Sequence, residues 1–203
     1  MAASKRTDIA GPAGRLEVAL DEPDGAPRGI AVLCHPHPVH GGTMDNKVVQ
    51  TLARAFVQVG YRSVRFNFRG VGASQGQWDE GHGEIDDAMA VVNAFRAAAL
   101  PLALGGFSFG GYVASHIASR VAAAGASARL VLVGPATSTF GVANAAPDTL
   151  VIHGEADDVV PLQATLDWAR PLQLPVVVMP GVGHYFHGQL TRLRDLVVQA
   201  WSN

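Results

Sequence analysis

Residues 101–111, PLALGGFSFGG, decide the fold. An apolar run of strand length leads into the pattern Gly-x-Ser-x-Gly, and helical periodicity follows over residues 109–124. We expect Ser108 at the tip of a sharp strand-to-helix turn, where flanking side chains would collide and positions 106 and 110 must be small. The helix that follows directs its N-terminal N–H groups at the same point. The stretch therefore predicts a serine presented between a buried strand and a buried helix.

The same stretch lies in an uncharged run between Arg96 and Arg120, long enough to cross a bilayer. Pro101, His116 and several glycines and serines make it a poor membrane helix, so strand, turn and helix are expected instead. The N-terminal residues 1–17, MAASKRTDIAGPAGRLE, have charges but no apolar core. No secretory signal is expected there, and the predicted location is the cytoplasm.

Outward from this stretch, strand-like apolar runs alternate with helical patterns. The expected strands are 14–22, 29–36, 62–68, 101–106, 129–134, 149–153 and 175–179, and the expected helices are 45–58, 84–98, 109–124, 161–170 and 188–201. Asp45 is the expected N-cap of the first helix. This alternation predicts an α/β fold with a mostly parallel twisted sheet of about seven to eight strands and helices on both faces. Ligands of such sheets bind beyond the carboxyl ends of the strands.

Composition excludes several classes of protein. The 203 residues carry no linker or repeat and are expected to form a single domain, residues 1–203. A hydrophobic fraction of 48% with 16% charged residues indicates a folded chain. The net charge of −2 offers no basic field for nucleic acid. The single cysteine, Cys34, excludes an internal disulfide and a four-cysteine zinc site, and it is expected to be a small buried hydrophobe.

Two further side chains follow strands at the predicted ligand-binding edge. Asp157 comes just after strand 149–153, and His184 lies among glycines after strand 175–179. Each has an ordinary alternative, a helix N-terminal acid for Asp157 and a surface loop histidine for His184. The chain order Ser108, Asp157, His184, each after its own strand, favours a nucleophile with its acid and base.

The sequence resembles the α/β-hydrolase superfamily, and most of all a small bacterial group of hydrolases akin to dienelactone hydrolase. The resemblance is carried by LCHPHPVHGGTMDNKVV (33–49), RFNFRGVGASQG (65–76), GGFSFGGYVA (105–114), HGEADDVVP (153–161) and GVGHYFHG (181–188). It implies a nucleophile at Ser108, an acid at Asp157, a base at His184 and no cofactor. Dienelactone hydrolase uses a cysteine nucleophile, so the serine here argues against the same substrate.

In this fold the oxyanion is held by the backbone N–H of the residue after the nucleophile, here Phe109, and by one from the loop after the third strand. That loop begins Cys34-His35-Pro36-His37-Pro38, and the prolines have no N–H. His37 and Phe109 are the expected donors, with Val39 or His40 as the fallback.

Residues 135–148 join two strands directly and are too short for a helical lid, so an open site is expected. Five aromatic residues are candidates for an apolar substrate rim: Phe107, Phe140, Tyr185, Phe186 and Trp78. The expected activity is cleavage of small or short-chain carboxylic esters through an acyl-enzyme, with thioesters, lactones or a peroxide reaction as variants. The expected partner is the small-molecule ester, with no nucleic acid or membrane, and the chain is expected to be a monomer or homodimer.

Other functions stay open on the sequence. His35, His37 and His40 have the spacing H-x-H-x-x-H of zinc hydrolases, but Val39 replaces the usual aspartate and the prolines limit convergence of the rings. The turn 69–76 is one residue off a dinucleotide-binding pattern. A non-catalytic binding protein on a hydrolase scaffold is the third alternative.

Overall fold

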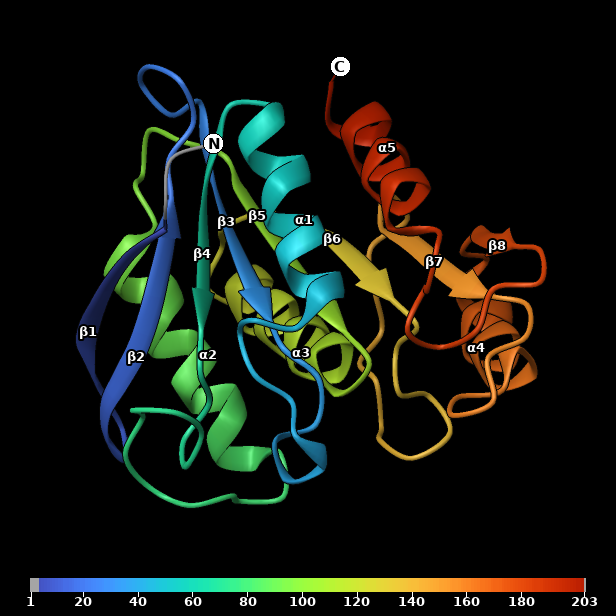
Figure 1. Cartoon of the computed structure of the whole chain (residues 1–203), viewed down its shortest axis with the longest axis horizontal. Helices are drawn as coiled ribbons and strands as arrows, with labels where there is room; N and C mark the ends of the chain where they lie inside the picture. The colour runs from blue at the N-terminus through green and yellow to red at the C-terminus, as the bar shows by residue number, and fades with distance from the viewer. Residues whose placement is uncertain (1–3, 203) are drawn as a thin grey trace.

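A computed structural model describes residues 4–202 of the chain. Eight strands form one sheet in the order β1-β2-β4-β3-β5-β6-β7-β8 (Figure 1). The strands are β1 Lys5–Gly11, β2 Gly14–Asp21, β3 Gly29–Cys34, β4 Tyr61–Phe66, β5 Leu102–Phe107, β6 Ala128–Val133, β7 Leu150–Gly154 and β8 Val176–Met179. The predicted fold class is confirmed, and the strands lie within a few residues of their expected ranges.

One strand, β2, runs opposite to the direction of the others in the sheet. β1 pairs with β2, and β2 with β4, in antiparallel register, whereas the strands from β4 to β8 pair in parallel. All six residues of β3 are buried, as expected of a central parallel strand. β1 was not predicted, because its segment KRTDIAG is polar and mostly exposed at the sheet edge.

Helices cover both faces of this sheet (Figure 1). The helices are α1 Lys47–Gln58, α2 His82–Phe95, α3 Phe109–Ala123, α4 Leu162–Ala169 and α5 Leu190–Trp201, with short 3₁₀ turns η1 Pro38–His40 and η2 Arg170–Leu172. Side chains of α1 and α5 share one buried cluster, which includes Phe56 and Trp201. Side chains of α2 and α3 share the other, against which Trp168 of α4 packs. The sheet therefore separates two apolar layers.

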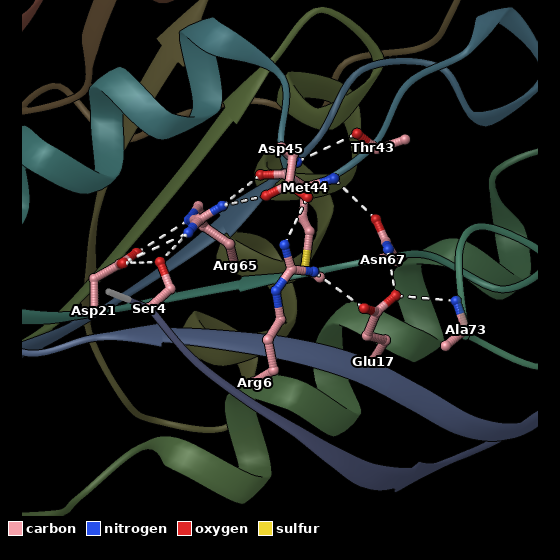
Figure 2. Close-up of polar contacts among 10 residues, drawn as sticks. All are labelled: Ser4, Arg6, Glu17, Asp21, Thr43, Met44, Asp45, Arg65, Asn67 and Ala73. Atoms are coloured by element: carbon pink, nitrogen blue, oxygen red, sulfur yellow. Dashed lines mark hydrogen bonds and ion pairs between the residues drawn. The ribbon is translucent and has the colours of Figure 1, made fainter. Parts of the chain in front are cut away.

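The start of α1 corrects one prediction. Asn46, not Asp45, is the N-cap, and its side-chain oxygen accepts the Val48 N–H at 2.9 Å. Asp45 instead forms ion pairs with Arg6 and Arg65, at 2.7 and 3.1 Å (Figure 2). Two arginines that are distant in the sequence, on β1 and β4, thus pair with the carboxylate that the local sequence had assigned to the helix.

The uncharged run forms β5, the turn at Ser108 and α3, as expected. Across residues 4–202, none of the helices combines the length and apolarity needed to cross a membrane. Residues 134–149, between β6 and β7, contain neither helix nor strand. The expectation that no helical lid lies in this connection is confirmed.

Candidate active site

The turn between β5 and α3 holds Ser108 in a backbone conformation that residues other than glycine rarely adopt. Its φ and ψ are 55° and −119°. A Cβ on Gly106 would lie 2.0 Å from the Gly110 carbonyl oxygen, and one on Gly110 would lie 2.2 Å from that of Cys34. Both positions therefore require glycine, because backbone atoms cannot move aside. The Ser108 N–H is fixed by the Val133 carbonyl of β6 at 3.0 Å.

Asp157 and His184 form a buried pair. His184 Nδ1 lies 2.7 Å from Asp157 Oδ2, and Asp157 Oδ1 accepts the N–H groups of Val159 and Val160 at 3.0 and 2.8 Å. Burial alone would raise the pKa of Asp157, but the hydrogen bonds from His184 and from the backbone outweigh it and lower that pKa. An ionised carboxylate only accepts, so His184 Nδ1 carries the proton of this hydrogen bond.

A second histidine beside this carboxylate was missed in the sequence. His153, on β7, is fully buried, and its Nε2 lies 2.9 Å from the Val160 carbonyl and 3.4 Å from Asp157 Oδ2. Burial lowers the pKa of His153, so the ring is neutral and its Nε2–H donates to the carbonyl. The spacing of four residues from Asp157, across the end of a strand, was the available signal.

Ser108 and His184 line one small pocket at the carboxyl edge of the parallel strands. Its volume is about 180 Å³. The other lining residues are Pro36, His37, His40, Gly41, Gly42, Asn46, Val159 and Tyr185. Asp157 reaches this pocket only through His184. The structure therefore brings together the three residues that were singled out after three different strands.

Two backbone N–H groups beside the pocket have no acceptor. Within residues 4–202, neither His37 N–H nor Phe109 N–H donates a hydrogen bond. The His40 N–H, one of the fallback donors, is already bound to the His37 carbonyl at 3.1 Å. The N–H groups of His37 and Phe109 are thus free for an oxygen of a ligand.

The aromatic residues expected at the rim divide into two groups. Tyr185 is half exposed and lines the pocket, while Trp78 and Phe140 are partly buried and pack on the His37 ring, with centroids 4.6 and 5.7 Å apart. The expectation was wrong for Phe107 and Phe186, which are fully buried among core residues on the α1 and α5 face. Phe107 instead packs behind His184, with ring centroids 4.9 Å apart. Phe107 points inward from strand β5, whereas Phe186 lies in the loop after β8 and has a left-handed φ of 54°.

The three histidines of the loop after β3 do not converge. His35 is fully buried and uses both ring nitrogens, with Nε2 accepting the Phe68 N–H at 3.1 Å and Nδ1 donating to the Pro36 carbonyl at 2.7 Å. His37 and His40 stack on each other at 4.5 Å. In the described part of the chain, no three His, Cys, Asp or Glu side chains are placed to hold a metal ion. This geometry does not favour the zinc alternative.

The remaining motif residues have structural partners. The turn 69–76 is tied to β2, since Glu17 accepts the Ala73 N–H at 3.0 Å and Ser74 Oγ accepts the Glu17 N–H at 2.9 Å. These contacts brace the turn and give no sign of a nucleotide loop. Cys34 is buried at the end of β3, which raises the pKa of its thiol.

The chain is similar to known proteins. The family model described as serine aminopeptidase, S33, matches residues 25–140. An uncharacterized protein from Rickettsia prowazekii is 41% identical over 114 residues, which are 54% of this chain and 48% of that protein. The match therefore spans about half the length of this curated relative.

Two solved structures match almost the whole chain. An alpha-beta serine hydrolase homologue from Coxiella burnetii is 40% identical over 98% of both chains, with a TM-score of 0.86. A serine hydrolase without lid from Xanthomonas campestris is 38% identical over 98% of this chain and 94% of that chain, with a TM-score of 0.89. With the family match, the sheet order and the turn at Ser108, these likenesses show that the chain belongs to the α/β-hydrolase superfamily of serine hydrolases.

Proposed function

We propose that the protein cleaves small or short-chain carboxylic esters through an acyl-enzyme, with Ser108 as nucleophile, His184 as base and Asp157 as the acid that orients the base. One observation carries the proposal. The His184 ring is bonded through Nδ1 to the ionised Asp157 and lines the same pocket as Ser108. That arrangement puts the proposed base and the proposed nucleophile at the same small space, as the reaction requires.

In the proposed reaction, His184 Nε2 takes the proton of Ser108 Oγ as that oxygen attacks the ester carbonyl carbon. Asp157 stabilises the imidazolium that forms. The oxyanion accepts hydrogen bonds from the free N–H groups of Phe109 and His37, and such a donor contributes roughly 3–4 kcal/mol in enzymes where one was removed. His184 then protonates the departing alcohol and activates the water that releases the acid.

Pocket size supports the choice of small esters. A volume of about 180 Å³ is below that of usual drug-sized sites, and residues 134–149 contain no helical lid. The walls are mixed, because His37, His40 and Asn46 stand beside Val159 and Tyr185. Thioesters and lactones undergo the same acyl transfer, so the test below does not depend on the natural substrate.

Labelling with a fluorophosphonate probe, read by intact mass and peptide mapping, tests the proposal. We expect one adduct, on Ser108, that disappears in Ser108→Ala and forms much more slowly in His184→Ala. Ser119→Ala is the matched control, because Ser119 lies on the same helix and bonds only the Ser115 carbonyl. It should label at the wild-type rate. A folded wild-type protein that forms no adduct, or forms it elsewhere, would refute the mechanism.

A further inference from the structure

A buried arginine holds the segment that follows the His37 loop. Arg65 on β4 is 3% exposed. Its guanidinium donates to the Met44 carbonyl at 2.8 Å, Asp45 Oδ1 at 3.1 Å, Asp21 Oδ2 at 3.0 Å and Ser4 Oγ at 2.8 Å. Figure 2 shows Arg65 between the two acidic side chains, with Met44 and Asp45 on one side and Asp21 and Ser4 on the other.

The amide side chain of Asn67 binds the backbone N–H of Met44, whose carbonyl is bound by Arg65. The Met44 N–H donates to Asn67 Oδ1 at 2.9 Å, and Asn67 Nδ2 donates to Glu17 Oε2 at 2.7 Å (Figure 2). The Met44 side chain is fully buried. Both backbone polar groups of Met44 are thus bound by side chains from the carboxyl end of β4, and neither end of the residue can shift alone.

The first residue of the loop, His35, is bound by a residue that also follows the carboxyl end of β4. The Phe68 N–H, one residue beyond Asn67, donates to His35 Nε2. Between these anchors the chain is tightly folded, because a Cβ on Gly42 would lie 2.0 Å from the Pro36 carbonyl oxygen. Residues 65–68 therefore hold the loop at His35 and at Met44, and His37 lies between the two points.

Stability alone gives a weak reason for this arrangement. Buried ion pairs are often no better for stability than apolar side chains of the same volume, because both charges must leave water. Their geometry, however, is specific, since a guanidinium offers its donors in a rigid plane. Arg65 uses that plane to bind three separate segments, at Ser4, at Asp21 and at Met44–Asp45, which fixes the distances between them.

We propose that Arg65 and Asn67 are positioning residues, which hold the His37 loop so that its backbone N–H meets the oxyanion. This inference rests on the proposed function. A donor is effective only near 2.7–3.1 Å from the developing charge. Misplacement by about 1 Å, even from a distant substitution, can lower a rate about 100-fold.

The kinetics of Ser108 labelling test this role without a known substrate. The fluorophosphonate rate is resolved into kinact and KI for wild type, Arg65→Lys and Asn67→Ala. Lysine keeps the charge beside Asp21 but cannot make the four contacts, and alanine leaves the Met44 N–H without its acceptor. We expect kinact to fall about 10- to 100-fold in each variant, with KI within about threefold of wild type.

Arg69→Lys is the matched control. Arg69 forms two hydrogen bonds through its guanidinium with the fully buried Asp87, at 2.9 and 2.8 Å, and joins the turn after β4 to α2 rather than to the loop. It should lower the melting temperature as Arg65→Lys does, while kinact stays near wild type. If Arg65→Lys does not fold, Asn67→Ala decides the comparison.

Three results would overturn the positioning role. Arg65→Lys and Asn67→Ala could leave kinact unchanged, or they could slow labelling through a higher KI rather than a lower kinact. Alternatively, Arg69→Lys could lower kinact by the same factor at the same melting temperature. All three leave the proposed function intact, because wild-type Ser108 still reacts. An unreactive wild-type Ser108 would instead refute the proposed function and this inference with it.

Discussion

Acid should destabilise the protein through His35, the buried histidine at the base of the loop. Burial lowers the pKa of His35 from 6.5 to about 3. Below about pH 6.5, the unfolded chain therefore binds a proton at His35. The folded chain binds that proton only near pH 3. Because the folded pKa is the lower one, the contribution is fully present above pH 6.5 and is lost as the pH falls.

The size of the loss follows from the two pKa values. One pH unit between them changes the free energy of unfolding by about 1.4 kcal/mol. Two units below the unfolded pKa, near pH 4.5, His35 alone should remove about 3 kcal/mol. That is a large part of the roughly 5–15 kcal/mol that stabilises an ordinary domain.

Urea unfolding followed by tryptophan fluorescence, from pH 8 to 4.5, measures this loss in wild type and in His35→Gln. Glutamine can accept the Phe68 N–H and donate to the Pro36 carbonyl, but it does not titrate. Asp157 and His153 also favour neutral pH, but both proteins contain them, so they cancel in the difference. We expect wild type to lose about 3 kcal/mol more than the variant. Parallel curves for the two proteins would show that His35 is not the buried neutral group described above.

Three further predictions concern the turn, the first helix and the acid. Gly110→Ala should lower the free energy of unfolding by about 3 kcal/mol or more, because the new Cβ would meet the Cys34 carbonyl. Gly141→Ala is the control, since the space around Gly141 is open, and it should lower that free energy by less than about 1 kcal/mol. Equal urea midpoints for the two variants would contradict this prediction. Asn46→Ala should cost about 1 kcal/mol through the lost N-cap, again by urea unfolding, and no change would exclude the cap. Asp157→Asn should lower kcat by roughly 10⁴ on an ester such as p-nitrophenyl acetate, as loss of the orienting acid does in serine proteases, and wild-type turnover would contradict the assigned role.

Local patterns predicted the parts of the fold that local chemistry determines. The turn at Ser108 could be placed because Gly-x-Ser-x-Gly between a strand and a helix has few other geometries. Asp157 and His184 could be placed at the same edge because the carboxyl ends of parallel strands share it. Their hydrogen bond depends on side-chain direction, which only the structure shows.

Other features depend on contacts between distant segments. β1 is held by pairing with β2 rather than by its own apolar side chains, so its polar sequence gave no strand signal. Arg65 lies in a strand that was predicted correctly, but its partners come from residues 4, 21, 44 and 45. Phe107 and Phe186 were expected at the rim because they are close to the site in the sequence. Both are buried in the core, Phe107 from strand β5 and Phe186 from a loop position with a left-handed φ of 54°.

The connection between β6 and β7 contains no helical lid. A bound substrate should therefore have one part that the protein contacts and another that lies in solvent. Under the proposed function, we expect the acyl group to fill the pocket of about 180 Å³ and the alcohol to extend into bulk water. Nothing must open to release the alcohol, so solvent viscosity should not limit turnover. Across esters of one acid, rates would then follow the acidity of the leaving alcohol and not its shape, and the protein would accept many alcohols while discriminating among acids.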